Sequence, residues 1–172
     1  MSTPPTTEQL QQAIHVICKV IAQIPCFHLF EDYIAQRFSS SEVEISLRAI
    51  THNAALDSTL MSLRCLDEFF SSSRVKDDIR ASDFPGVAMQ TFLAPDDATA
   101  INKYLAHITA TRADIVTKHW FLDDMVLLGL QHGITFLSTI ESTFPPATES
   151  GQTELRGVRD AARLLIPKIT TL

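Results

Sequence analysis

The sequence predicts an all-α protein with four main helices and one further helix near the C-terminus. Apolar residues recur every three or four positions over most of the 172 residues, which is the spacing of one face of a helix. Only five glycines are present, too few for the many tight turns of a β-sandwich or barrel. No strand–helix alternation surrounds a glycine-rich phosphate loop, so P-loop and dinucleotide-binding folds are excluded.

The first helix is expected to begin near residue 7 and to be interrupted at a proline. Thr6 or Thr7 can cap its N-terminus, and Glu8 lies in the first turn, where a negative charge is favourable. Pro25 should break or kink the helix, because proline lacks the N–H that the helix needs. An apolar stripe continues beyond this break to Phe38.

A second, long helix is expected from the capping-box pattern Ser41–Glu44 to about Phe70. Two neighbouring faces of this helix carry apolar residues. The first face holds Asn53, Leu56, Leu60, Leu63, Asp67 and Phe70, and the second holds Leu47, Ile50, Ala54 and Met61. So wide an apolar surface is typical of a bundle helix that packs on two sides.

A long loop with short helical pieces is expected over residues 71–95, and loops of this length are often functional. The third helix should begin at Pro95, where Asp96 and Asp97 favour a helix N-terminus. Its apolar residues share one face: Ile101, Leu105 and Ile108.

The fourth helix is expected over residues 113–142 and should stop before Pro145 and Pro146. Its predicted buried side consists of Phe121, Met125, Leu128, His132, Thr135, Phe136 and Thr139. Residues 148–151 read as a linker. The last helix is expected over residues 153–166, with Pro167 ending it.

Length and composition indicate one helical domain over residues 7–172, preceded by a flexible tail of residues 1–6. No window reaches the roughly 18–20 apolar residues of a membrane span, and the N-terminus lacks the pattern of a secretory signal. Three cysteines are an odd and sparse set, which favours reduced thiols in a cytoplasmic protein. The net charge of −6 disfavours a general polyanion binder.

The most informative motif lies in the third helix, where Asn102-Lys-Tyr-Leu-Ala-His107 continues to Arg112. It resembles the polar-x-x-x-Ala-His element of HEPN-domain proteins (higher eukaryotes and prokaryotes nucleotide-binding). The longer pattern Asn-Lys-x-x-Ala-His-x-Thr-x-x-Arg is closer to the abortive-infection-type HEPN subgroup. The stretch 54–67 is similar to the long second helix of that subgroup, and Trp120 lies where a bulky aromatic residue is expected.

This resemblance implies an up-and-down four-helix bundle that is often dimeric. Active members are metal-independent ribonucleases in which an Arg and a His from each protomer meet at the dimer groove. In this chain, His107 and Arg112 would be catalytic, and Asn102, Asp67 and His119 would support them. No metal or cofactor is implied. The expected partners are a second copy of the chain and RNA or an antitoxin or other partner protein of a defence or toxin–antitoxin system.

The chemistry of RNA cleavage explains why such a site needs these residue types. Attack by the 2′-hydroxyl requires one proton to be removed and another to be delivered, and an imidazole that titrates near pH 6.5 suits both tasks. Negative charge builds on the phosphoryl oxygens, and a guanidinium group matches two of those oxygens at once.

The motif departs from the family pattern at one position. The family has Arg where this chain has Asn102, and Arg112 follows the His instead. Arg112 and His119 form a second, partial match, in which Ala113 replaces a polar residue. The alternative function is therefore a catalytically inactive helical bundle that binds a partner or ligand.

Structural roles compete with the catalytic ones for single residues. His107 can instead be a surface or interface histidine that bonds to Asp114. Asp67 lies on an apolar face, where a carboxylate needs a partner. It can orient His107 or Arg112, or it can pair with Arg64 or Arg74.

A metal site is the other alternative, because His15, Cys18, Cys26 and His28 are residue types that bind zinc. Their spacing matches no closed zinc finger or ribbon, and Cys18 lies in an isoleucine-rich helix, which favours burial. A metal-dependent bundle of the DinB type could use His52, but it needs a His-x-x-x-His pair. Phe136 follows His132 by four residues, so that pair is absent.

Overall fold

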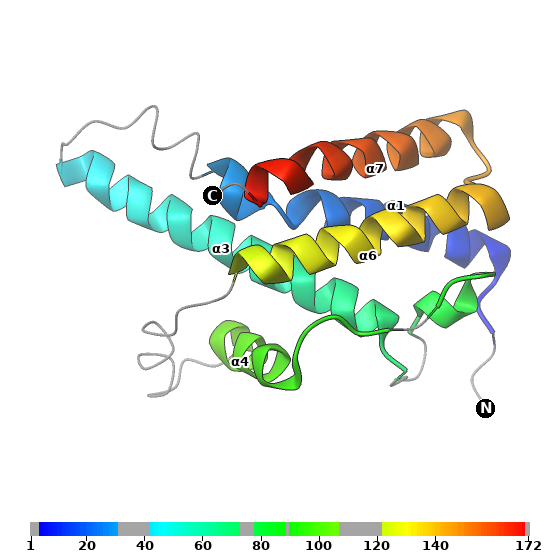
Figure 1. The fold of residues 1–172 in the computed structure, drawn as a ribbon, viewed down its shortest axis with the longest axis horizontal. Helices are drawn as coiled ribbons and strands as arrows, with labels where there is room; N and C mark the ends of the chain where they lie inside the picture. The colour runs from blue at the N-terminus through cyan, green and yellow to red at the C-terminus, as the bar shows by residue number, and fades with distance from the viewer. Residues whose placement is uncertain (1–3, 31–41, 73–77, 89, 107–121, 171–172) are drawn as a thin grey trace.

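The computed structural model describes residues 4–30, 42–72, 78–88, 90–106 and 122–170. Within these ranges the chain is helical and contains no strand, as predicted (Figure 1). The elements are α1 (Thr7–Gln23), α3 (Glu42–Phe70), the short 3-10 helix η1 (Ala81–Asp83), α4 (Pro95–Ala106), α6 (Leu122–Thr143) and α7 (Glu149–Ile169). None of the helices in the described ranges has the length and apolarity to cross a bilayer.

The start and end of α1 follow local sequence signals. Gln9 N–H donates to the Thr6 hydroxyl at 3.2 Å, and Thr6 N–H donates to the Gln9 side chain at 2.8 Å. This reciprocal pair is a capping box that satisfies two backbone groups at the helix start. A turn at Ile24 and Pro25 separates α1 from a further helical stretch over residues 26–30, so the predicted break is confirmed.

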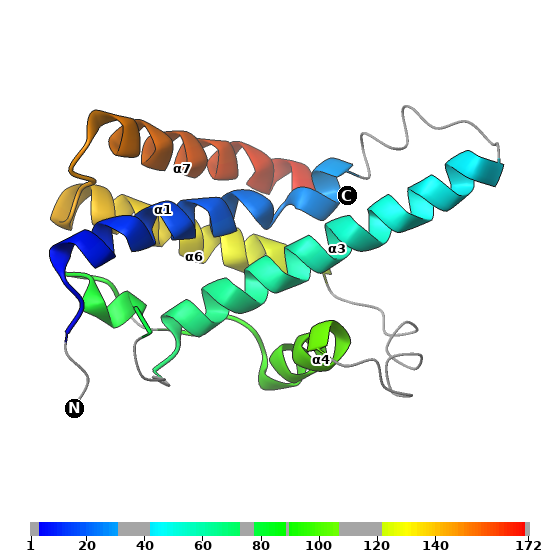
Figure 2. The same cartoon turned by 180° about the vertical axis from the view of Figure 1, so that it is seen from behind.

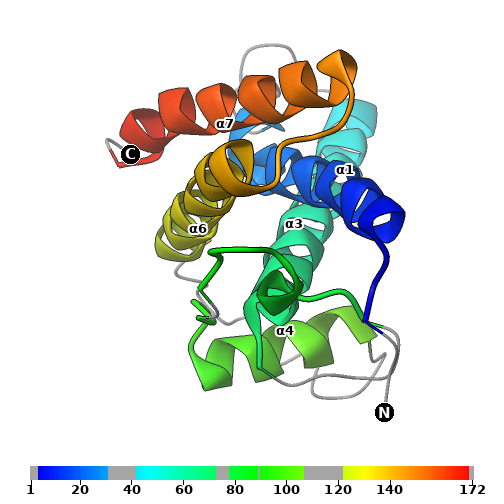
Figure 3. The same cartoon turned by 90° about the vertical axis from the view of Figure 1, so that its right-hand side faces the viewer.

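Four helices pack along one another. α1 and α7 run in one direction, and α3 and α6 run in the other (Figures 1 and 2). The C-terminal helix α7 packs against both α1 and α6 and is therefore an integral part of the bundle. α4 instead packs mainly against α3, beneath which it lies (Figure 3).

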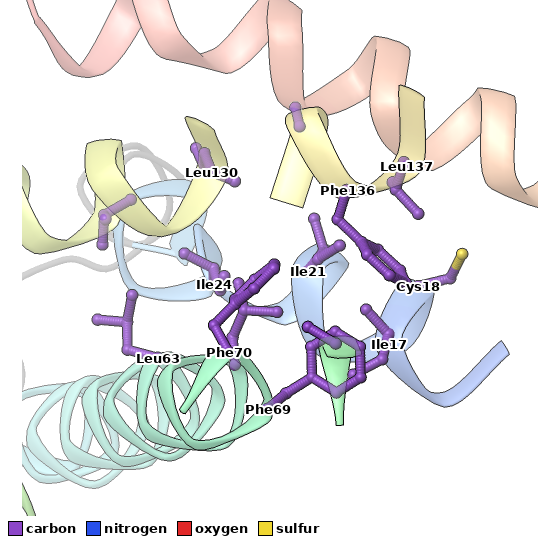
Figure 4. Packing of buried hydrophobic residues seen from close by; sticks show 14 of the residues in the cluster. Ile17, Cys18, Ile21, Ile24, Leu63, Phe69, Phe70, Leu130, Phe136 and Leu137 are labelled. Carbon is purple, nitrogen blue, oxygen red and sulfur yellow. The ribbon is translucent and has the colours of Figure 1, made fainter. Parts of the chain in front are cut away.

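Most of the core comes from three helices, α1, α3 and α6, whose apolar residues meet between them (Figure 4). The labelled members are Ile17, Cys18, Ile21, Ile24, Leu63, Phe69, Phe70, Leu130, Phe136 and Leu137. Phe69 and Phe136 form an edge-to-face pair with ring centroids 5.1 Å apart, a geometry that adds to the energy of apolar burial. The predicted inward residues Leu60, Leu63 and Phe70 are indeed buried.

The second apolar face of α3 differs from expectation. Leu47, Ile50 and Met61 are 46%, 65% and 45% exposed, so packing on two sides is wrong for this stretch. The N-terminal turns of α3, drawn in cyan, extend beyond the ends of α1, α6 and α7 (Figures 1 and 2). No described helix lies there to cover them.

Two glycines of α6 allow its close approach to α1 and α3. A Cβ at Gly129 would lie 2.7 Å from Leu63 Cδ2, and one at Gly133 would lie 2.9 Å from Ile21 Cγ1. Both distances are shorter than real contacts allow. Two residues predicted to lie on the buried side of α6, Leu128 and Thr135, are exposed instead.

The last helix is longer than predicted at both ends. Thr148 caps it by accepting the N–H of Gly151 at 3.1 Å, so residues 149–151 belong to α7 and not to a linker. Pro167 lies inside the final turn, and the helix ends only at Ile169. Proline destabilises a helix less in the final turn than in the interior, because little of the helix remains after the backbone hydrogen bond that it removes.

The segment between α3 and α4 contains a short helical piece, η1, as expected. Arg80 is buried and ties this segment to α3. One of its guanidinium nitrogens donates to the carbonyl oxygen of Glu68, and the other binds Asp78 at 2.6 Å. The Arg80 N–H also donates to Asp83 at 2.9 Å.

Candidate functional site

Asp67 joins α3 to the start of α4. Its Oδ1 atom accepts the backbone N–H groups of Phe92 at 2.7 Å and Leu93 at 2.9 Å. The carboxylate is buried, and these two bonds supply the partners that burial requires. The expected pairing with Arg64 is not formed, because Arg64 bonds instead to Glu68 at 3.3 Å. Arg74, the other expected partner, lies outside the described residues.

Asn102 lies in the second half of α4 and is half-buried. Its Oδ1 atom is buried and has no hydrogen-bond partner among the described residues. A buried oxygen without a partner is rare and costs about 1–3 kcal/mol. A ligand or a moving group that completes this bond would recover that cost.

Two further polar groups of this kind lie on α3, against which α4 packs. Oδ1 of Asp57 and Nε of Arg64 are buried and have no hydrogen-bond partner in the part of the chain that the structure describes. The two residues are seven positions apart and therefore share a face of α3. Sequence reasoning did not select either as a functional residue. The only sequence signal for a shared role was their seven-residue spacing, which places both on one helix face. Charged residues on solvated helix faces show the same spacing, so it does not indicate a functional site.

The remaining predicted site residues are His107, Arg112 and His119, and they lie outside the described residues. In the sequence, His107 directly follows the last residue of α4, Ala106. Among the described residues, the structure therefore brings together the two helices that carry Asp67 and Asn102.

The alternative zinc grouping does not form. His15 Nδ1 lies 2.6 Å from Glu154 of α7, and His28 Nε2 lies 2.8 Å from Asp123 of α6. Cys18 is buried, and burial together with the nearby Glu154 raises its pKa from 9.0 to about 12. A thiol of that pKa is a poor metal ligand, since metals bind the thiolate. Within the described ranges no three His, Cys, Asp or Glu residues are placed to share a metal ion.

The histidines of the DinB-type alternative also have structural contacts. The His52 ring lies 4.9 Å from the Phe27 ring in an edge-to-face arrangement. His132 Nδ1 lies 3.0 Å from the backbone carbonyl oxygen of Leu128.

No model of a protein family, curated protein or solved structure matches this chain. The similarity to HEPN proteins therefore depends on the residues of the chain itself.

Proposed function

We propose that this chain is a HEPN-like, metal-independent ribonuclease that acts as a toxin of a defence or toxin–antitoxin system. The observation that supports this function is a set of buried polar atoms on α3 and α4 that lack a hydrogen-bond partner within the described ranges, namely Asp57 Oδ1, Arg64 Nε and Asn102 Oδ1. A buried polar atom without a partner is explained by a bound water or ion, by strain, or by a functional role in which substrate or a second group completes its bond; the last explanation is the one proposed for these atoms. His107 follows α4 directly in the sequence.

In the proposed reaction, the neutral imidazole of His107 accepts the proton of the RNA 2′-hydroxyl. The 2′ oxygen attacks the adjacent phosphorus, and the bond to the 5′ oxygen breaks. The imidazolium form of His107 from a second protomer delivers a proton to that leaving oxygen. The products are a 2′,3′-cyclic phosphate and a 5′-hydroxyl end.

Arg112 supplies the fixed positive charge that the pentacoordinate phosphorus requires. Asn102 holds the imidazole of His107 through its unpartnered Oδ1 atom, which can accept an imidazole N–H. Asp67 has a positioning role, because it fixes the chain that enters α4 through Phe92 and Leu93.

The exposed stripe of α3 supports the homodimer that this mechanism needs. Leu47, Ile50 and Met61 lie on one side of the helix and are exposed in the single chain. Apolar side chains left exposed in a single chain are candidates for an interface with another chain. Ile50→Glu should convert the dimer to a monomer in analytical ultracentrifugation, and Leu164→Glu, at another exposed apolar residue on α7, should leave it a dimer.

Cleavage of RNA by the purified protein in EDTA tests the enzyme. The wild type should cleave a tRNA pool and a structured RNA to cyclic-phosphate ends, and His107→Ala should reduce cleavage by at least a hundredfold. His15→Ala is the matched control, because His15 is an exposed histidine of α1 whose side chain, among the described residues, bonds to Glu154 alone. Equal cleavage by wild type and His107→Ala would contradict the proposed site.

A catalytically inactive binding module is the second candidate, and the exposed stripe of α3 together with Asn102 in place of Arg favours it. If the protein is folded and dimeric but cleaves neither the tRNA pool nor the structured RNA, this candidate is supported. The net charge of −6 of the chain would then favour a basic protein segment as the partner.

A further inference from the structure

A depression of about 520 Å³ lies between the N-terminal halves of α1 and α7, which start at the same end of the bundle (Figures 1 and 2). Its volume falls within the range of binding pockets. One wall belongs to α1, and the other belongs to the α6–α7 connection and the first turns of α7. The lining residues that matter most here are Glu8, Gln12, Val16, Pro146, Ser150 and Glu154.

Glutamine side chains hold the α6–α7 connection in place beside this depression. Gln11 of α1 donates through Nε2 to the carbonyl oxygen of Pro145 at 3.3 Å and accepts the N–H of Ala147 at 2.9 Å. Gln152 of α7 donates through Nε2 to the carbonyl oxygen of Pro146 at 3.0 Å. The depression is therefore preformed, and a molecule that binds there does not have to order the connection first.

The charge of the depression is negative. Glu8 and Glu154 line it, and none of the described residues that line it is Lys or Arg. Oε2 of Glu154 bonds to His15 at 2.6 Å, and its Oε1 atom can accept a bond from another molecule. Arg156 of the same helix bonds instead to Glu141 of α6. The depression therefore attracts positive charge and repels the phosphates of nucleic acids and of anionic lipids.

A second depression, of about 410 Å³, lies next to the first around α1. Gln12 and Val16 line both depressions, and Val16 is 55% exposed between them. Asp78 and Ile79 lie on the far side of the second depression, and its described lining also includes no Lys or Arg. An occupant that covers Val16 and reaches into both depressions is longer than a small molecule, which favours a segment of protein chain.

We propose that this surface of α1 binds a short basic segment of a partner protein. A Lys or Arg of that segment bonds to the carboxylates of Glu8 and Glu154, and a neighbouring apolar side chain covers Val16. The charges select a basic partner, and burial of apolar surface adds affinity. No described residue of α4, which carries Asn102, lines either depression.

Fluorescence anisotropy with three labelled peptides of equal length tests this surface. In the first peptide Lys alternates with Leu, in the second Glu replaces every Lys, and in the third Ser replaces every Leu. We expect the Lys–Leu peptide to bind at least tenfold more tightly than either of the others. Its binding should weaken as salt is added, because salt screens exposed charges. Spermine, a small cation, should not displace it at an equal concentration of positive charge.

Two carboxylate variants assign peptide binding to the first depression. Glu8→Gln and Glu154→Gln each remove one negative charge but keep an oxygen, and each should weaken binding of the Lys–Leu peptide several-fold. Asp124→Asn is the matched control, because it removes the same charge from an exposed position at the start of α6. That position lies toward the other end of the bundle (Figure 1), so this variant should bind like the wild type.

A second pair of variants tests the contact with Val16. Val16→Arg places a positive charge on the surface and should abolish peptide binding. Leu164→Arg adds the same charge at a residue of α7 that is 72% exposed, and it should bind like the wild type. Both side chains are exposed, so both variants should fold.

The surface is disproved if the Lys–Leu peptide does not bind, if either comparison peptide binds as tightly, or if spermine displaces it. It is also disproved if Glu8→Gln, Glu154→Gln and Val16→Arg all bind like their controls. No step of this test involves RNA. Failure here therefore leaves the ribonuclease proposal unaffected, and absence of cleavage leaves this surface unaffected.

Discussion

Oδ1 of Asp67 accepts the backbone N–H of Leu93 at 2.9 Å, which links α3 to the chain that enters α4. The same oxygen accepts the N–H of Phe92 at 2.7 Å. Both donors belong to an irregular segment that has no helical partners for them. One buried carboxylate therefore replaces the hydrogen bonds that a helix would supply, and it fixes where α4 begins relative to α3.

Removal of this carboxylate should destabilise the protein. Asp67→Ala leaves two amides without their acceptor, so we expect a loss of about 2–3 kcal/mol in the free energy of unfolding. Asp67→Asn keeps an oxygen in place and should lose only about 1 kcal/mol, because the bond loses its charge. Urea denaturation of the three proteins measures both values. If Asp67→Asn were as unstable as Asp67→Ala, the hydrogen bonds to Phe92 and Leu93 would not be the source of the lost stability.

Sequence patterns predicted the main helices well where local signals were strong. Capping at Thr6, the break at Pro25, the start at Pro95 and the end near Phe70 are all confirmed. Each depends on neighbours in the chain, namely caps, prolines and charges in the first turn. The length of α7 was missed because Gly151 and Pro167 usually interrupt helices, and here they do not.

The arrangement of the helices could not be predicted in the same way. The exposure of Leu47 and Ile50 depends on how far α3 extends beyond its neighbours, which periodicity does not report. The burial of the unsatisfied atoms of Asp57, Arg64 and Asn102 depends on how α3 and α4 pack with the rest of the bundle. The prediction that Asp67 is a carboxylate on an apolar face is correct. Its partners, however, are backbone amides, and because every residue except proline carries such an amide, the sequence does not indicate which ones bind.

Gly133 and Gly157 should respond to alanine with opposite signs. A Cβ at Gly133 meets Ile21 at 2.9 Å, so overpacking should outweigh the better helix propensity and cost about 1–2 kcal/mol. Gly157 lies inside α7 with nothing within 4 Å of an added Cβ, so Gly157→Ala should stabilise by about 0.5–1 kcal/mol. Thermal unfolding of both variants beside the wild type gives the two signs. Stabilisation by Gly133→Ala would mean that α1 and α6 pack less closely.

The buried thiol of Cys18 should make the protein sensitive to high pH. Burial, with a smaller effect from Glu154, raises its pKa from 9.0 to about 12 in the folded state. The folded chain then keeps a proton that the unfolded chain releases, so stability is complete below pH 9 and is lost as pH rises toward 12. The slope contributed is at most about 1.4 kcal/mol per pH unit.

Cys18→Ala isolates that contribution, because other groups also titrate at high pH. The variant should be less stable than the wild type at pH 8, and the difference between them should shrink as pH rises above 9. Denaturant midpoints at several pH values measure this difference. A constant difference across the range would show that the thiol does not titrate on unfolding.

Glu141 should have a pKa below its ordinary value of 4.5, chiefly because it accepts hydrogen bonds from Arg156 and Arg159. Arg156 Nε lies 2.6 Å from its Oε1 atom, which joins α7 to α6. The contact is complete above pH 4.5 and is lost as pH falls through the lower value of the folded state. Carboxyl NMR titration should give Glu141 a midpoint below pH 4.5, and Arg156→Ala should move that midpoint upward. Arg163 bonds to Ser138 and Asp160 instead, so Arg163→Ala should change the midpoint less.

Asn102 should separate stability from activity. Its buried Oδ1 atom lacks a partner among the residues that the structure describes, so Asn102→Leu, of similar shape, removes an uncompensated polar group and should leave the thermal midpoint equal or higher. If Asn102 holds the imidazole of His107, the same variant should reduce RNA cleavage at least tenfold and shift the pH at which cleavage is half-maximal, because the imidazole loses a bond to its N–H. Asn102→Gln, which retains an amide oxygen, should recover part of that activity. Lower stability of the Leu variant with unchanged cleavage would identify Asn102 as a structural residue and would remove it from the proposed site.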